Sequence, residues 1–177
     1  ALNIEHLDGV LPNPDHVLAL KANLAVMNSA DAQIEILEKA VQDRVKLRPQ
    51  FGFLKTVPGI GPILALTIML ETGEIERFAC VGNYASYCRC VGSKKISNGK
   101  RKGSGNTKNG NKYLAWAFVE AANFAIRFNS KIKGFYQKKK SKSNGIVAIK
   151  AVAHKLCRAC YYIIKDQVPF DITKAFA

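Results

Sequence analysis

Residues 53–73 read FLKTVPGIGPILALTIMLETG, and this stretch decides the fold class. Two apolar segments of helical character flank the PGIGP turn at residues 58–62, so we predict a helix-hairpin-helix. Gly59 and Gly61 allow the backbone to turn tightly and to come close to a phosphate. The N–H groups at the start of the second helix could then receive that phosphate. A tight turn between two helices with no ligand is the alternative.

The residues before this turn predict one long helix. Asn13, Pro14 and Asp15 have the pattern of a helix start: a capping Asn, a Pro at the first helical position and an acid. We predict a coiled-coil-like helical arm over residues 15–50, after a linker remnant at 1–14. The arm is a dimerisation element or a spacer, and an ordinary long helix packed on its own domain is the alternative. Its apolar row is Leu20, Leu24, Met27, Ile34, Leu37, Val41 and Val45.

The residues after the turn predict further helices in one domain, 51–177. Residues 113–128 place Leu114, Ala117, Phe118, Ala121, Ala125 and Phe128 on one side of a helix. A basic loop follows at 137–145, and another apolar helix spans 146–165. No alternating strand pattern is present, so we predict an all-α protein: a long coiled-coil-like helix followed by a helical domain.

Charge is divided unevenly along the chain, whose formal net charge is +14. Residues 1–76 hold 6 basic and 10 acidic residues, whereas residues 77–165 hold 20 basic residues and one acid, Glu120. Such a block repels itself unless a polyanion is near, and nucleic acid is the usual polyanion. We expect no membrane partner, because the apolar runs fall far short of the roughly 20 residues that a span needs.

The most basic stretch is SKKISNGKRKGSGNTKNGNK at residues 93–112. It is not a P-loop, because no Gly lies five residues before Gly99 and Arg101 follows Lys100. A serine becomes a nucleophile only when it is positioned and assisted, and attack on a phosphodiester needs cations around the phosphoryl group. Ser97 has a turn and three cations within six residues. A serine in a turn of a basic loop, with no catalytic role, is the alternative.

Metal chemistry is not expected from the residues of this chain. Five cysteines and no visible signal peptide indicate free thiols in a reducing compartment. His154, Cys157 and Cys160 drift around a helix face, so we predict no zinc site. Glu71, with Glu74 and Glu76, is interpreted as a solvated helix end, and Glu120 as the partner of a Lys or Arg.

The order of motifs resembles the C-terminal half of transposases of the insertion-sequence 110/116/902 family. This group includes the DEDD-type, guide-RNA-directed recombinases and the related pilin-gene invertase. The resemblance covers roughly residues 15–170. Its motifs are VPGIGPILA (57–65), SYCR (86–89), SNGKRKG (97–103), NTKNGNKYLAWA (106–117), VEAA (119–122) and AIKAVAHKLCRACYY (148–162).

The resemblance implies that Ser97 is the nucleophile that cuts DNA and holds it as a phosphoserine. It also implies a basic catalytic loop at 92–112 and a guide RNA as a second nucleic-acid partner. Four acids of an N-terminal RuvC-like domain, absent here, bind Mg²⁺ in the family, so we expect no cofactor in this chain and an inactive fragment. The expected DNA- or RNA-binding residues are Lys94, Lys95, Lys100, Arg101 and Lys102 at the scissile phosphate, Lys108 and Lys112 along the strand, and Gly59 and Gly61 at the turn.

Three hypotheses therefore stand at the level of sequence. The first is a DNA transposase or site-specific recombinase domain, cytoplasmic and nucleoid-associated in a bacterium, which forms homodimers or higher oligomers through its arm. The second is a non-catalytic helix-hairpin-helix module that binds nucleic acid through phosphates. The third is a dimer scaffold whose charge only keeps it soluble.

Overall fold

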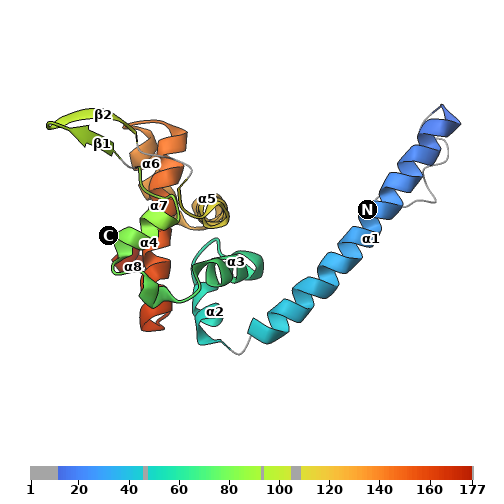
Figure 1. Cartoon of the computed structure of the whole chain (residues 1–177), viewed down its shortest axis with the longest axis horizontal. Helices are drawn as coiled ribbons and strands as arrows, with labels where there is room; N and C mark the ends of the chain where they lie inside the picture. Colours follow the sequence, from blue (N-terminus) through green and yellow to red (C-terminus); the bar gives the residue numbers. More distant parts are fainter. Residues whose placement is uncertain (1–11, 46–47, 93, 105–108, 177) are drawn as a thin grey trace. The chain divides into compact units, whose positions relative to one another are not determined.

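Helices make up nearly all of the regular structure in this chain (Figure 1). The computed structural model describes residues 12–45, 48–92, 94–104 and 109–176. Over these residues the all-α prediction is confirmed. The chain forms two compact units, residues 1–47 and 48–177. The predicted linker remnant at 1–14 lies almost wholly outside the described residues.

The described part of the first unit contains one long helix, α1, which spans Pro14–Val45 and has 32 residues. Its start agrees with the predicted signal, because the side chain of Asn13 accepts a hydrogen bond of 2.8 Å from the backbone N–H of Asp15. The helix ends before the predicted boundary, and a separate helix begins at Pro49. Met27, Ile34 and Leu37 of the predicted apolar row are at least half exposed. Leu20, Leu24 and Val41 of the row are half-buried, and Val45 is buried.

Two helices flank the PGIGP turn, and the second lies where it was predicted, whereas the first ends at Leu54, within the predicted segment. They are α2 (Pro49–Leu54) and α3 (Pro62–Thr72), and the first has only 6 residues. Ile60 in the turn and Val57 before it are buried, and the backbone N–H of Ile60 donates to the carbonyl of Val57. The structure thus places a turn between two helices at this point of the chain. Its use as a nucleic-acid-binding helix-hairpin-helix stays a prediction.

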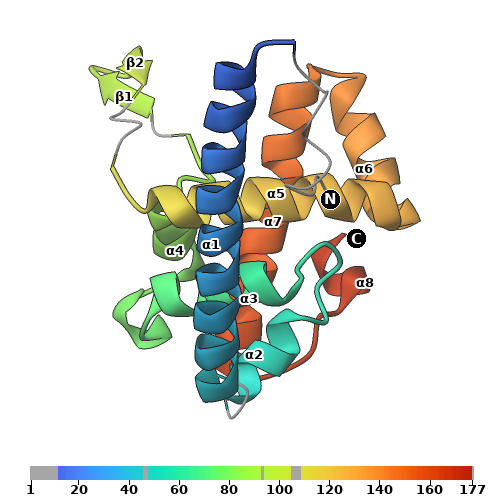
Figure 2. The same ribbon diagram turned by 90° about the vertical axis from the view of Figure 1, so that its right-hand side faces the viewer.

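The core of the second unit is built on α7 (Gly145–Asp166), which packs against α5 (Lys112–Phe128) and α6 (Ser130–Lys140). Figure 2 shows α5 running across α7. Small side chains on the buried side of α5 bring the two backbones close, which explains the alanine-rich pattern. The buried residues of α5 are Leu114, Ala117, Phe118, Ala121, Ala122 and Ala125.

Two expectations about this region were wrong. Phe128 is 74% exposed, because it lies at the end of α5 beyond the reach of the core. Residues 137–140, expected in a basic loop, form the last turn of α6. Cations are favourable at a helix C-terminus, so the run of lysines at 138–140 is compatible with a helix end.

Asparagine side chains cap the N-termini of α5, α6 and α7. The side chains of Asn111, Asn129 and Asn144 each accept a hydrogen bond from a backbone N–H in the first turn of α5, α6 and α7. Such caps satisfy donors that a helix start otherwise leaves without a partner. The asparagines of the KNGNK and KSN segments are therefore helix signals as well as parts of basic stretches.

Shorter elements complete the second unit: η2 (Ile75–Arg77), α4 (Val81–Tyr87) and α8 (Ile172–Ala175). Tyr84 of α4 is fully buried, and its hydroxyl lies 3.0 Å from the hydroxyl of the buried Thr72. Among the described helices, none combines the length and the apolar character needed to cross a membrane.

A β-hairpin interrupts the helical fold and was not predicted. Strands β1 (Lys94–Ser97) and β2 (Lys100–Ser104) pair antiparallel, with a register shift between Lys95 and Ile96. Asn98 and Gly99 connect them with φ values of 50° and 70°. Positive φ at both central residues is typical of the type I′ turn, which Asn-Gly favours. The predicted basic loop at 92–112 therefore contains an ordered turn.

Candidate nucleic-acid interface

The two ends of the basic segment are joined at its base. The backbone N–H of Asn111 donates to the carbonyl of Tyr87 at 2.7 Å. The Arg89 guanidinium donates to the carbonyl of Gly110, at 2.8 Å from Nη2 and 3.2 Å from Nε. Residues 87–89 and 110–111 thus form a clamp, from which the hairpin leaves the helical domain.

Gly110 fits the clamp because it has no side chain. A Cβ at this position would lie 2.4 Å from the carbonyl oxygen of Tyr87, and Gly110 has a φ of 91°. Any residue with a Cβ would therefore be destabilising here, because of both the close contact and the positive φ. The Gly of the KNGNK segment therefore serves the closure of the loop.

Asn111 connects the clamp to two helices. Its Oδ1 accepts hydrogen bonds from the backbone N–H groups of Tyr113 and Leu114, which caps α5. Its Nδ2 donates to Oε2 of Glu71 at 2.6 Å and lies 3.4 Å from the hydroxyl of Tyr87. The pKa of the Tyr87 hydroxyl is lowered, first by the hydrogen bond from Asn111 and then by one from Arg77.

Glu71 was interpreted as part of a solvated helix end, and that interpretation was wrong. Its side chain is half-buried, and its carboxylate accepts the hydrogen bond from Asn111. Arg89 and Tyr87 were likewise missed as members of a structural clamp. The Gly110-Asn111 pair before an apolar helix was the one local signal that could have indicated the cap.

Ser97 is exposed and occupies the last position of β1, directly before the Asn98-Gly99 turn. Its cross-strand partner is Lys100, the first residue of β2. Directly opposed residues of an antiparallel pair project from the same face of the ladder. The hairpin therefore presents the Ser97 hydroxyl beside a cation, without burying either group.

The predicted cations are distributed over the hairpin and the start of α5. Lys100 and Lys102 are exposed in β2, and Lys112 is exposed as the first residue of α5. Lys94 and Lys95 lie in β1 and Arg101 in β2, although the positions of their side chains are not described. Lys108 lies outside the described residues. The structure thus gathers Ser97 and five of the seven predicted cations into one hairpin.

Gly59 and Gly61 have different surroundings. A Cβ on Gly59, whose φ is 86°, would lie 2.3 Å from the carbonyl oxygen of Ala121 and 2.7 Å from the nitrogen of Ala125. Gly59 therefore allows the turn to pack against the backbone of α5. Gly61 has a φ of −84°, and a Cβ added there would meet no atom within 4 Å. Phosphate contact at these two glycines stays a prediction, and Gly61 has the more open position for it.

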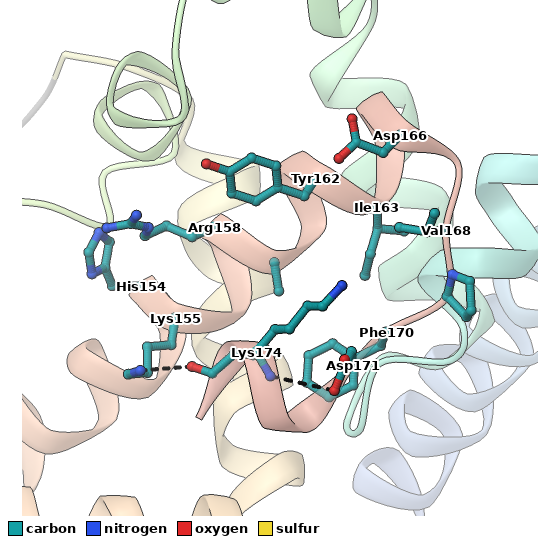
Figure 3. Close-up of a pocket in the computed structure, with 13 residues that line it drawn as sticks. His154, Lys155, Arg158, Tyr162, Ile163, Asp166, Val168, Phe170, Asp171 and Lys174 are labelled. Atoms are coloured by element: carbon teal, nitrogen blue, oxygen red, sulfur yellow. Dashed lines mark hydrogen bonds between the residues drawn. The ribbon is translucent and has the colours of Figure 1, made fainter. Parts of the chain in front are cut away.

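A cavity of about 830 Å³ lies between α7 and the C-terminal segment 168–175 (Figure 3). Lys155 donates a 2.7 Å hydrogen bond to the carbonyl of Ala175, which holds α8 against α7. His154 lines the cavity, and its pKa is lowered, first by burial and then by the neighbouring Arg158 and Lys155. Sequence reasoning did not indicate this cavity, and Ser97 does not line it.

The thiols and His154 do not form a metal site. Cys157 and Cys160 are buried in the core, and burial raises the pKa of both. All five cysteines are free thiols. In the part of the chain that the structure describes, no group of three His, Cys, Asp or Glu side chains could hold a metal ion.

The second unit is thus a helical domain that presents a basic β-hairpin with an exposed serine. Residues 52–137, which contain the glycine turn, the clamp and the hairpin, match the sequence model of the "Transposase IS116/IS110/IS902 family". Over these residues the predicted family resemblance is confirmed.

The chain is also similar to a Pseudomonas aeruginosa (strain PAO1) protein described as "Probable family 20 transposase", with 25% identity over 101 residues. That alignment covers 57% of this chain and 30% of the relative, so the chain spans well under half of that protein.

Proposed function

We propose that this chain is the DNA-cleaving part of a transposase or site-specific recombinase of a mobile insertion sequence, with Ser97 as the nucleophile. The observation that carries the proposal is the pairing of an exposed Ser97 with Lys100 at the tip of a basic hairpin. This hairpin lies inside the segment that matches the transposase family. The activity of the whole parent protein belongs to the proposal.

The hairpin geometry supports a role in phosphate chemistry. In the cleavage step, the Ser97 hydroxyl oxygen bonds to phosphorus and one sugar oxygen leaves, taking up a proton to become a free hydroxyl end. The product is a phosphoserine ester, so the number of phosphate ester bonds is unchanged and a second strand can reverse the step. Lys100 and Lys102 would stabilise the negative charge that gathers on the phosphoryl oxygens.

The clamp explains how a short two-stranded hairpin could hold a reactive group in place. A two-stranded hairpin alone is marginally stable in water. Here the longer segment that carries the hairpin is joined at its two ends, through the bonds of Arg89 to Gly110 and of Asn111 to Tyr87. Joining these ends would reduce the number of conformations open to the nucleophile and the cations, and so the entropy lost when DNA binds.

Magnesium is expected to act in the parent protein through acids outside this chain. Within the described residues no three potential ligands come together, and the family resemblance implies that the acids that bind the ion belong to an N-terminal domain. When bound elsewhere, Mg²⁺ would polarise the scissile phosphate. Residues 1–177 alone should therefore bind nucleic acid without recombining it efficiently.

The decisive experiment is trapping of a covalent adduct between the parent protein and its element-end DNA. Ser97→Ala should abolish the adduct and leave DNA affinity within about twofold, because only the attacking oxygen is lost. Ser104→Ala in β2 is the matched control and should retain the adduct. If Ser97→Ala still traps DNA, the assignment of Ser97 is wrong, and Ser93 or Ser104 becomes the candidate.

A non-catalytic nucleic-acid-binding module is the alternative function, favoured by the glycine turn before α3. Both functions predict that the binding constant falls as salt rises. The logarithm of the constant falls linearly with the logarithm of the salt concentration, with a slope of about −0.9 for each phosphate neutralised. Salt dependence therefore does not separate them. An adduct that depends on Ser97 does, because a binding module forms none. Absence of binding to DNA and to RNA at low salt would favour a dimer scaffold instead.

Partners beyond DNA are part of the proposal. The exposed apolar residues of α1, including Met27, Ile34 and Leu37, favour self-association through the helical arm. A guide RNA is expected from the family resemblance, and the 20 basic residues of the 77–165 block could bind it. We place the protein in the bacterial cytoplasm with the nucleoid, where both nucleic acids are present.

A further inference from the structure

One face of α5 carries exposed aromatic rings. Tyr113, Trp116, Phe124 and Phe128 are 52%, 50%, 41% and 74% exposed, while the opposite side of the helix is buried. Their spacings of 3, 8 and 4 residues place them along one broad face. Large apolar side chains that are this exposed indicate a site of interaction with a partner or ligand. We call these four residues the aromatic row.

We propose that the aromatic row is a stacking surface for unpaired bases of a single-stranded nucleic acid. The inference rests on the nucleic-acid substrate of the proposed function and adds that part of this substrate is single-stranded at α5. In a duplex the base faces are covered by neighbouring bases. Only unpaired bases can lay their faces on a protein ring.

Cations beside the rings favour nucleic acid as the occupant of this face. The Lys112 ammonium lies 4.8 Å from the centre of the Tyr113 ring, and the Arg127 guanidinium lies 6.0 Å from the centre of the Phe124 ring. Aromatic rings interleaved with cations are the usual composition of single-strand binding surfaces. An apolar protein partner would have to bury these charges, which costs free energy without a matching acid.

The ring geometry suits a run of stacked bases. The rings of Phe124 and Phe128 are parallel to within 6°, with centres 6.5 Å apart. Bases that stack on these two rings would therefore lie parallel to each other, as successive bases of a strand do. From Tyr113 to Phe128 the helix rises about 22 Å, enough to follow several nucleotides.

The position of Glu120 indicates that bases, and not phosphates, face α5. Glu120 is the single acid of the basic block and is half-exposed between Trp116 and Phe124 along the helix. It was expected to pair with a Lys or Arg, yet no ion pair to it occurs among the described residues. A carboxylate repels phosphate but accepts hydrogen bonds from the exocyclic amino groups of bases.

The aromatic row begins where the hairpin leaves the domain. Asn111 caps α5 and belongs to the clamp, and Tyr113 and Trp116 follow within two turns of the helix. A strand with one phosphate at the hairpin could thus continue with its bases on α5. This continuity joins the candidate cleavage group and the stacking surface on one path.

Trp116 is the single tryptophan of the chain and reports directly on stacking. The test titrates the 177-residue protein with a mixed-sequence DNA oligonucleotide, either single-stranded or annealed to its complement. We expect the single strand to quench Trp116 emission and to bind more tightly than the duplex. Phe124→Ala and Phe128→Ala should each weaken single-strand binding about 5- to 150-fold, the range for loss of one stacked base, with little change for the duplex.

Tyr162→Ala is the matched control, since Tyr162 is 45% exposed on α7 outside the row, and it should leave both affinities unchanged. Circular dichroism melting of each variant checks folding. Equal quenching by both DNA forms, or unchanged single-strand affinity in the Phe124→Ala/Phe128→Ala double variant, overturns the inference. Emission that changes with protein concentration alone assigns the row to a protein interface and also overturns it. Duplex binding without single-strand preference leaves the Ser97 proposal standing, whereas absence of binding to either form counts against both.

Discussion

The side-chain amide of Asn111 donates a 2.6 Å hydrogen bond to the carboxylate of Glu71, forty positions earlier in the chain. This contact connects the end of α3 to the start of α5. Because the backbone of Asn111 also bonds to Tyr87, the same residue closes the segment from which the hairpin extends. One asparagine therefore couples helix capping to the placement of the basic segment.

Replacing Asn111 should cost both stability and binding. Asn111→Ala removes a cap worth about 0.5–2 kcal/mol and leaves a half-buried carboxylate without its donor. We expect a lower thermal midpoint and weaker nucleic-acid binding, because the hairpin base loosens. Asn144→Ala, which removes the comparable cap of α7, should lower the midpoint alone. Equal nucleic-acid affinity in the two variants, measured by fluorescence anisotropy, would show that the link to Glu71 does not position the hairpin.

Replacement by alanine should destabilise the protein far more at Gly59 than at Gly61. Gly59→Ala adds a methyl group 2.3 Å from the Ala121 oxygen at a φ of 86°, so we expect a loss of about 2–5 kcal/mol. Gly61→Ala meets open space at a negative φ and should change stability by less than about 1 kcal/mol. Urea denaturation of both variants measures the difference. Similar losses in the two variants would contradict the packing of Gly59 on α5.

Gly61→Ala also tests the phosphate prediction at the turn. If the turn binds a backbone phosphate at Gly61, this variant should lose nucleic-acid affinity while its unfolding midpoint changes little. Unchanged affinity would assign the turn to packing alone.

Sequence patterns predicted the parts of the fold that depend on periodicity. The apolar spacing along 113–128 and 146–165 agrees with α5 and α7 to within one residue at each end, because their buried faces repeat every three or four positions. The helix α6 was missed, since its last turn consists of lysines. Periodicity carries no information about a helix that is mostly exposed.

The hairpin was missed for a different reason. Its strands, KKIS and KRKGS, lack the alternation of apolar and polar residues that marks a half-buried strand. The Asn-Gly pair was nevertheless a strong local signal for a two-residue turn. Contacts such as that between Asn111 and Glu71 join distant positions, so no local pattern could have indicated them. The residues alone left the role of Ser97 open, and the family resemblance supplied the assignment that now has to be tested.

The buried hydroxyl pair of Thr72 and Tyr84 should contribute to stability only as a pair. The two oxygens lie 3.0 Å apart, and burial raises the pKa of Tyr84 well above its usual value, so the phenol stays neutral. Tyr84→Phe leaves the Thr72 hydroxyl without this partner and should cost about 1–3 kcal/mol. Adding Thr72→Val should cost less than the sum of the two single changes. Strict additivity in thermal unfolding would contradict the hydrogen bond.

The Asn98-Gly99 turn should control cleavage without controlling the fold. Gly99 has a φ of 70°, so Gly99→Val strains the turn by about 1–2 kcal/mol or more and disfavours the strand pairing that sets Ser97 opposite Lys100. The strands β1 and β2 form a two-stranded sheet outside the helical core, so the thermal midpoint of the domain should change little. We expect at least a tenfold slower formation of the covalent adduct in the parent protein. Asn98→Gly keeps positive φ accessible and should retain the rate within about threefold. If Gly99→Val forms the adduct at the normal rate, the turn does not position the nucleophile, and Ser97 must be held by the DNA itself.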